Sequence, residues 1–175
     1  MHGSAVAAYG ARPAPVRRLT TMVTERSEHV LASGCWSLQR RVLPQHTDHA
    51  GVMWHGAYLG WLEEARVEAL AQAGLAYSDL SARGLELPVV SLAIDYRQAL
   101  RHGDLVRLES QVLPRRGVRL PWRTRFVTAG GVLAAEARVD LVLVDLGSGP
   151  TQRRLARQLP ADLAEAVATL VRGPQ

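Results

Sequence analysis

The stretch "HTDHAGVMWHGAYLGWLEEARVEAL" (residues 46–70) decides the fold of this 175-residue chain. It begins with an aspartate, three histidines and a glycine in one short segment, and its pattern then becomes helical. Glu63 and Arg66 lie one turn apart on the expected polar side of that helix. Its broad apolar face consists of Tyr58, Trp61, Leu62, Ala65, Ala69 and Ala73. The pattern predicts one long helix over residues 56–73, laid against a sheet and stopped by Gly74.

Alternating apolar and polar residues on both sides of this helix predict β-strands. One strand is expected before the helix, in residues 35–43, and four strands are expected after it, in residues 89–98, 105–113, 118–128 and 132–146. Tight turns such as Gly130-Gly131 predict a meander of consecutive hairpins, and therefore an antiparallel sheet. A last amphipathic helix is expected from Ala161 to Val171, with Pro160 at its start.

This order of elements predicts an α+β fold in which a single long helix covers one face of an antiparallel sheet. The other face and the edge strands then lack a cover within the chain. Unpaired strand edges are usually protected by pairing or by association. The sequence therefore predicts a homo-oligomer, at least a dimer.

The composition excludes several classes of protein. Hydrophobic residues make up 47% of the chain, but no apolar run reaches the roughly 18 residues of a membrane span, so no membrane partner is expected. The net charge of +5 is typical of nucleic-acid binding, yet all 21 basic residues are arginine and no asparagine occurs, which indicates a codon bias. Aromatic residues, at 5%, offer few stacking platforms, so no nucleic-acid partner is expected either. Some arginines are expected to contact a ligand that carries phosphates.

The single cysteine, Cys35, excludes an internal disulfide and indicates a cytoplasmic protein, in which it serves as a small buried hydrophobic residue. Residues 1–24 contain no acidic residue, and they are consistent with a disordered tail, a transit peptide or translation that starts at Met22. We expect residues 1–30 to form a disordered basic tail and residues 31–175 to form a single domain.

Three segments resemble the hotdog-fold acyl-CoA thioesterases of the 4-hydroxybenzoyl-CoA thioesterase-like family. They are "TDHAGVMWHGAYLGWLEEAR" (47–66), "PVVSLAIDYRQALRHGD" (88–104) and "LAAEARVDLVLVD" (133–145). The match covers the chain from about Trp36 to Pro160. The chain departs from the family pattern at His46, where an acidic residue is frequent, at Ala57, where asparagine is usual, and at Pro44, where tyrosine often stands. The resemblance implies a hotdog fold, with the sheet wrapped around the central helix.

The resemblance also implies a site for thioester hydrolysis, which needs an oxygen nucleophile and a group that polarises the carbonyl. Asp48 is then the nucleophile or general base, and His55 and Tyr58 are the other catalytic candidates. The backbone at the start of the helix polarises the carbonyl through the N–H groups of His55 and Gly56, because these have no partner within the helix. Gly51 lets the chain bend closely around the reacting atoms.

Phosphates of CoA are expected to meet arginines near the mouth of the pocket, and Arg97, Arg101, Arg115 and Arg116 are the candidates. No cofactor is expected. A metal site built from His46, Asp48, His49 and His55 is disfavoured, because their spacing lacks two histidines on one helical face.

Structural roles compete with the catalytic ones. An aspartate in a Thr-Asp-x-x-Gly loop often closes an Asx-turn. Tyr58 is expected to pack in the core. Trp54 and Trp61 are expected in the core as well, beside an acyl pocket, and Glu64 is a reserve catalytic candidate because another hotdog branch uses a glutamate on this helix.

The expected function is therefore an acyl-CoA thioesterase that hydrolyses an acyl or aryl thioester to the free acid and CoA. Two alternatives stay open. An acyl-carrier-protein thioesterase would suit the basic surface, and a non-catalytic acyl-CoA-binding module would use the same fold without turnover.

Overall fold

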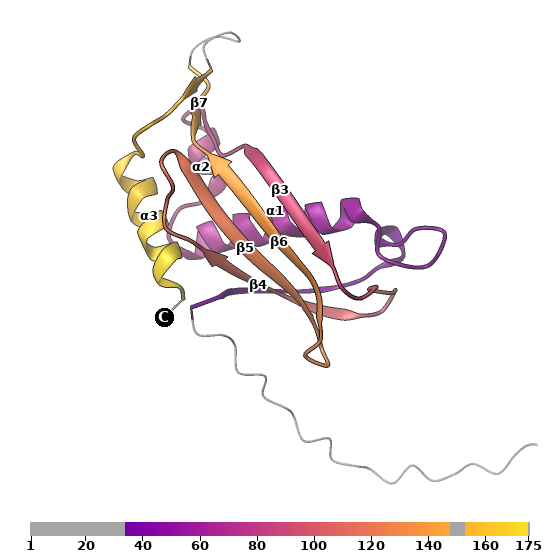
Figure 1. Cartoon of the computed structure of the whole chain (residues 1–175). Coiled ribbons are helices and arrows are strands. Elements are labelled where there is room, and N and C mark those ends of the chain that lie inside the picture. Colours follow the sequence, from indigo (N-terminus) through magenta and orange to yellow (C-terminus); the bar gives the residue numbers. More distant parts are fainter. Residues whose placement is uncertain (1–33, 148–152, 175) are drawn as a thin grey trace, which may run out of the picture.

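The structure is a computed structural model that describes residues 34–147 and 153–174 (Figure 1). The predicted tail of residues 1–30 lies outside these ranges. The elements are, in chain order, β1 (Trp36–Arg41), η1 (Pro44–His46), α1 (His55–Gln72), α2 (Tyr77–Ser81), β2 (Leu85–Glu86), β3 (Val89–Tyr96), β4 (Leu105–Val112), β5 (Arg119–Thr128), β6 (Leu133–Val142), β7 (Val144–Asp145), β8 (Arg154–Leu155) and α3 (Ala161–Arg172).

The main sheet has five strands in the order β1-β4-β5-β6-β3, and every neighbouring pair is antiparallel. The predicted antiparallel sheet is thus confirmed, but the predicted meander is wrong for β3. Strands β4, β5 and β6 form consecutive hairpins, whereas β3 pairs with β6 across the sheet. The segment after β3 crosses to the other side before β4 begins, so β3 becomes an edge strand (Figure 1).

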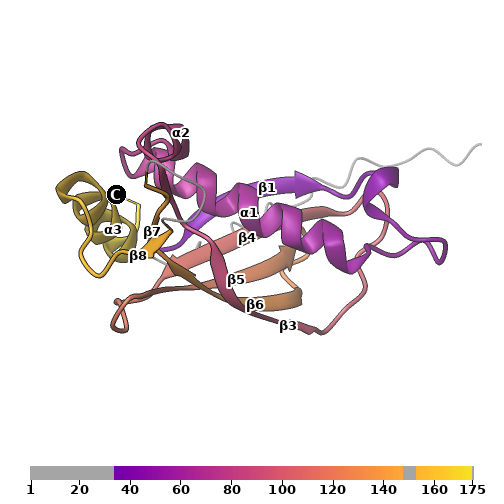
Figure 2. The same cartoon turned by 90° about the horizontal axis from the view of Figure 1, so that it is seen from above.

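Helix α1 lies along one face of this sheet, with α2 and α3 gathered near its C-terminal end (Figure 2). The predicted helix is confirmed, and its buried residues are Ala57, Tyr58, Trp61, Leu62, Ala65, Ala69 and Leu70. Three alanines on this face let the helix axis approach the strands closely. The facing side chains of β4, β5 and β6, among them Leu108, Phe126 and Ala137, are fully buried. Helix and sheet together form one core.

Helix α3 and a small second sheet complete the end of the molecule where α1 stops. Helix α3 begins after Pro160, as predicted, and Trp36 Nε1 on β1 donates a hydrogen bond to the Leu170 carbonyl of α3 at 3.0 Å. The chain leaves α3 at Gly173, which packs so tightly on Gly34 that an added Cβ would lie 2.4 Å from the Gly34 Cα. A small second sheet, β2-β7-β8, was not predicted. No helix in the described part of the chain is long and apolar enough to cross a bilayer.

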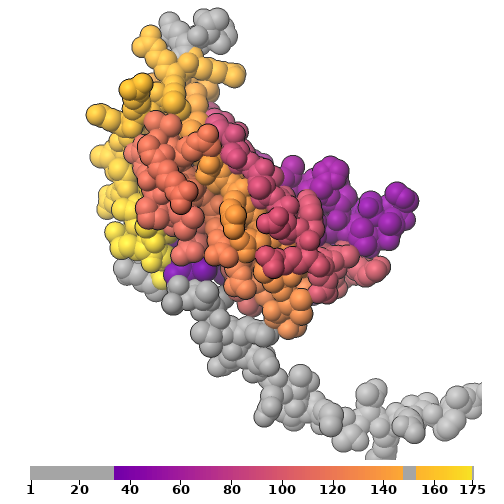
Figure 3. All heavy atoms as spheres, in the orientation of Figure 1, coloured from indigo at the N-terminus to yellow at the C-terminus, as the bar shows by residue number. Residues whose placement is uncertain are grey.

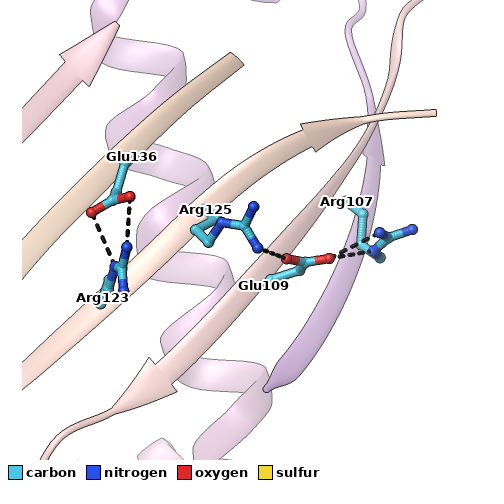
Figure 4. Close-up of polar contacts among 5 residues, drawn as sticks. All are labelled: Arg107, Glu109, Arg123, Arg125 and Glu136. Carbon is cyan, nitrogen blue, oxygen red and sulfur yellow. Dashed lines mark hydrogen bonds and ion pairs between the residues drawn. The ribbon is translucent and has the colours of Figure 1, made fainter. Parts of the chain in front are cut away.

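The other face of the main sheet is open, and Figure 3 looks directly onto it. Its side chains are charged and form ion pairs across the strands (Figure 4). Glu136 accepts two hydrogen bonds from Arg123, both of 3.0 Å, and Glu109 lies between Arg107 and Arg125. The arginines cover the two carboxylates, so Glu109 is only 4% exposed and Glu136 only 6% exposed. This face is therefore organised by paired charges rather than by an apolar surface.

The paired arrangement predicts a pH-dependent contribution of Glu136 to stability. The hydrogen bond from Arg123 holds the pKa of this carboxyl below its usual range. A carboxyl whose pKa is lower in the folded state stabilises the fold above its unfolded-state pKa and loses that contribution as pH falls through the folded-state pKa. We expect Glu136→Gln to unfold at lower urea concentration than wild type at pH 7, and the difference to shrink towards pH 3. Glu165→Gln, on the exposed side of α3, is the control. A difference that stays constant over this pH range would contradict the assignment.

Candidate active site at the start of the central helix

Residues 47–53 form a small hairpin that projects beyond the N-terminal end of α1 (Figures 1 and 2). Thr47 and Met53 pair as an antiparallel bridge, and the Asp48 N–H donates to the Val52 carbonyl at 2.9 Å. The turn closes with a 3.0 Å hydrogen bond from the Gly51 N–H to the Asp48 carbonyl. The segment rich in titratable groups is thus an ordered turn.

Asp48 orients its own carboxylate within this turn. Its Oδ1 accepts hydrogen bonds from the Ala50 N–H at 2.8 Å and the Val52 N–H at 3.3 Å. This is the Asx-turn that the Thr-Asp-x-x-Gly pattern indicates. Asp48 is exposed, and its Oδ2 accepts no hydrogen bond from the described part of the chain. One oxygen is therefore fixed while the other faces solvent.

Gly51 has a backbone reason to be glycine. Its φ of +74° lies in the left-handed region, which glycine adopts without strain. A Cβ at this position would meet no atom within 4 Å in the described chain. The expectation that Gly51 permits a close approach thus has no support in the single chain, and the conformation of the turn is sufficient to explain it.

The hairpin is tied to the body of the protein at its base. The Met53 N–H donates to the Leu100 carbonyl at 2.7 Å, and Val52 pairs with Arg101. The Trp54 N–H donates to the His46 carbonyl at 3.0 Å, directly before α1 starts. These bonds hold the Asp48 turn at the same end of the molecule as the first turn of α1.

The first turn of α1 presents free backbone donors. Its N-cap, Trp54, makes no side-chain cap hydrogen bond, and within the described residues no acceptor is bonded to the N–H groups of His55 and Gly56. These groups point out of the helix at its positive end, where they favour a negatively polarised oxygen. No hydrogen bond in the described chain joins them to the Asp48 carboxylate, whose bonds come from the Ala50 and Val52 N–H groups.

Trp54 lies over this turn rather than in the core. Its ring approaches Gly56 so closely that a Cβ there would come within 2.1 Å of ring carbons, and its centroid is 5.4 Å from that of the His55 ring. Trp54 is 43% exposed, so its expected core position is wrong, whereas Trp61 is buried as expected. Gly56 is therefore required by the indole that packs across the helix start.

Tyr58 packs in the core, as predicted, and is 2% exposed. Its ring contacts Tyr96 and Phe126, with centroids 5.0 and 5.1 Å away. Burial, with a smaller contribution from Tyr96, raises the pKa of Tyr58 to about 12. The phenol therefore stays protonated at neutral pH, where it can donate a hydrogen bond but cannot act as a base.

An open hollow of about 310 Å³ lies beside the helix start and is lined by Val52, Met53, Tyr58, Tyr96, Arg97, Gln98 and Ala99. Tyr96, which is 53% exposed, lies in the second segment that resembles the family but was not among the site residues predicted from the sequence. Its contact with Tyr58 brings the end of β3 to the candidate site.

The structure brings two of the four candidate arginines to this end of the molecule. Arg97 lines the hollow, and Arg101 pairs with Val52 of the hairpin. Arg115 and Arg116 lie between β4 and β5, at the far end of β4, roughly 25 Å away for an eight-residue strand. Within one chain these two cannot serve the same pocket mouth as Arg97 and Arg101.

The remaining candidates take structural positions. Glu64 forms an ion pair with Arg40 of β1. The ring of His46 packs edge-on against Trp61, and its Nδ1 accepts from the Leu43 N–H. Within residues 34–147 and 153–174, no group of three or more histidine, cysteine or acidic side chains is arranged to hold a metal ion.

Comparison with known proteins identifies relatives that cover most of the folded region. A sequence model of the thioesterase-like superfamily matches residues 42–167. A Synechocystis protein, sll0410, which is named only provisionally as an esterase, is 38% identical over 77% of this chain and 81% of its own length. The acyl-CoA thioester hydrolase YbgC of Escherichia coli is 30% identical over 60% of this chain and 78% of its own. A 1,4-dihydroxy-2-naphthoyl-CoA thioesterase from Synechocystis superimposes with a TM-score of 0.69 over 78% of this chain and 98% of its own, at 24% identity.

Proposed function

This chain belongs to the thioesterase-like superfamily of hotdog acyl-CoA thioesterases and is a thioester hydrolase, and we propose that Asp48 and the first turn of α1 carry out its reaction. The substrate is an acyl or aryl thioester of CoA, and the products are the free acid and CoA. The observation that carries this assignment is the 3.0 Å bond from Trp54 N–H to the His46 carbonyl, which holds the Asp48 hairpin beside the unpaired N–H groups of α1.

The carboxylate of Asp48 is suited to a nucleophile or a general base. Because Oδ1 is fixed by the N–H groups of Ala50 and Val52, the side chain loses little freedom when it acts. Oδ2 is left for a water molecule or for the carbonyl carbon itself. As a general base it takes a proton from the attacking water; as a nucleophile it forms an acyl anhydride that water then hydrolyses.

The N–H groups of His55 and Gly56 would bind the carbonyl oxygen of the thioester. As water or Asp48 adds to the carbonyl carbon, that oxygen becomes negative, and the two donors and the helix dipole stabilise it. When the C–S bond breaks, the electron pair leaves on the CoA sulfur, which takes up a proton. The His55 side chain, exposed next to these donors, would orient the water or the substrate.

Tyr58 would shape the pocket as a neutral donor, since its raised pKa excludes a role as base near neutral pH. Arg97 and Arg101 would bind the phosphates of CoA, with bidentate geometry available to each guanidinium. Arg115 and Arg116 would reach such a ligand only in a site that a neighbouring subunit completes.

A second copy of the chain would close the site, and strand β3 is the surface proposed for it. Val90, Leu92 and Tyr96 are 47%, 40% and 53% exposed on this edge strand. Leu92 pairs with Val139, which is 3% exposed, so this row points to the same side of the sheet as α1 but lies beyond its cover. An apolar row on an unpaired edge favours pairing between subunits. The homo-oligomer therefore stays part of the proposal, with the cytosol as its compartment.

A panel of thioesters tests the proposal. Purified protein is mixed with acetyl-, hexanoyl-, palmitoyl-, benzoyl- and 4-hydroxybenzoyl-CoA, and the released thiol is followed with a chromogenic disulfide. We expect at least one substrate with kcat/KM of about 10⁴ M⁻¹s⁻¹ or more. Acyl-carrier-protein thioesters of the same acyl groups form the second arm. A clear preference for the carrier-protein thioesters would identify an acyl-carrier protein, rather than CoA, as the carrier of the substrate. Binding of every thioester without release of thiol would refute the proposed hydrolysis.

A further inference from the structure

A second cavity lies away from the candidate active site, between the C-terminal half of α1, the sheet and α3. Its volume is about 70 Å³, and its walls include Arg66, Leu120, Trp122, Leu163, Val167 and Leu170. Arg66 is 11 residues beyond His55, which places it about 16 Å further along the helix. Nothing in the proposed reaction uses this space.

The wall of this cavity is mostly apolar, but the polar residues Glu63, Arg66 and Tyr77 also line it. Arg66 is half-buried, and its Nη1 is buried with no hydrogen-bond partner in the described chain. Burial lowers the pKa of its guanidinium, but an arginine remains charged at neutral pH. A buried charge without a partner is costly, so such a group is normally paired.

The neighbouring acceptors do not supply that pair. Glu63, one turn before Arg66, also lines the cavity and its charge acts on the guanidinium, but its side chain is exposed and no hydrogen bond or ion pair joins the two among the described residues. The Tyr77 hydroxyl, also at the wall, donates to Glu86 and accepts from the Leu87 N–H. The expectation that Arg66 lies on the solvated polar side is therefore wrong. The Arg66 side chain instead lines the cavity, and its Nη1 has no hydrogen-bond acceptor there in the described chain.

We propose that this cavity is a second binding site, separate from the catalytic one, for a small aliphatic carboxylate whose oxygens pair with Arg66. The apolar wall suits the alkyl chain, and the guanidinium fork suits the carboxylate. A cavity of about 150 Å³ holds the six carbons of benzene, so 70 Å³ takes an alkyl chain of about three carbons, with the carboxylate at Arg66 on the wall. A free acid of this size would thus bind without occupying the site of hydrolysis.

Thermal unfolding of the full chain in butyrate, butyramide or octanoate, with sodium chloride matching the ionic strength, tests this proposal. At about ten times its Kd, butyrate should raise Tm by about 3–5 °C. Butyramide has the same shape without the charge and should give less than a quarter of that shift, and octanoate should be too long. Equal shifts with butyrate and butyramide would overturn the proposal, and this comparison needs no variant.

Arg66→Met provides the second arm. It should abolish the butyrate shift while leaving the ligand-free protein as stable as wild type or more stable, because an unpaired buried charge is removed. Arg83→Met is the matched control, since Arg83 is an exposed arginine paired with Asp162 and should keep the shift. A butyrate shift that persists in Arg66→Met would exclude this site. These Tm measurements use no thioester, so their outcome does not depend on whether the proposed hydrolysis is correct.

Discussion

Asp48→Asn is expected to lower the turnover of the preferred acyl-CoA by at least 10²–10⁴-fold, the usual contribution of a general base. Asparagine keeps an oxygen that can accept from the Ala50 and Val52 N–H groups, so the turn is expected to persist. The substitution replaces the second carboxylate oxygen with an uncharged NH₂ group. That group can neither attack a carbonyl carbon nor take a proton from water. KM should change little, because the side chain contributes little to ground-state binding.

Asp145→Asn is the matched control for this measurement. Asp145 Oδ1 accepts from the Gly147 N–H at 2.8 Å, so it closes the same kind of turn at the other end of the molecule. Both variants should unfold within a degree or two of wild type, and only Asp48→Asn should lose turnover. If Asp48→Asn retained a tenth or more of the wild-type kcat, the carboxylate would have no part in the chemistry.

Leu92→Arg is expected to convert the proposed oligomer to monomers and to reduce activity to near background. The change places a charge in the middle of the apolar row on β3, and a buried interface tolerates an unpaired charge poorly. Light scattering after gel filtration measures the mass, and the same thioester assay measures activity. Because Leu92 is 40% exposed in the single chain, the fold itself should tolerate the arginine.

Ser91→Arg is the control that distinguishes loss of the proposed interface from general damage to strand β3. Ser91 is exposed on the opposite face of β3, where it pairs with Asp140 beside Arg119, so an arginine there points away from the apolar row and leaves it intact. We expect this variant to stay oligomeric and active. Monomers from both variants would indicate general damage to β3, and an unchanged mass for Leu92→Arg would place the interface elsewhere.

The local elements of this fold could be predicted from the sequence because their periodicity is local. The apolar face of α1 from Tyr58 to Ala69 repeats every three or four residues, and β6 alternates from Leu133 to Leu141, so both element types are as predicted. The bounds of α1 also agree, but the strand predicted over residues 132–146 ends at Val142, and Val144–Asp145 form β7 in the second sheet. The order of the strands in the sheet, by contrast, could not be predicted from local periodicity. Alternation in β3 is the same whether it pairs with β4 or with β6, and only the packing of the whole sheet decides between them.

Side-chain positions near the ends of α1 were predicted less well for a related reason. Trp54 and Trp61 are seven residues apart, which is the same helical face, but Trp54 precedes the helix and its ring turns over Gly56 instead. Arg66 is on the polar side by periodicity, yet α3 returns from the end of the chain and covers it. Neither α3 nor the loop that shapes the helix start contributes to the local pattern from which the prediction was made.

The candidate site was predicted as a set of residues rather than as a geometry. The family resemblance selects Asp48, Gly51, His55 and Tyr58, and the structure places all of them at one end of α1. The Asx-turn of Asp48 follows from its own short motif. The separation of Arg115 and Arg116 from Arg97 and Arg101 depends on the length and direction of β4, which spacing along the chain does not give.

The tight contact between Gly34 and Gly173 has a practical consequence for engineering. The chain enters β1 and leaves α3 at the same place, beside the 3.0 Å bond from Trp36 to Leu170. A short linker could join these positions, and new ends opened at Gly130-Gly131, in the exposed turn between β5 and β6, would give a circular permutant with the same strand order. Labels attached at Gly34 and at Gly173 would lie side by side, with the length of β1 between them and the hairpin of Asp48.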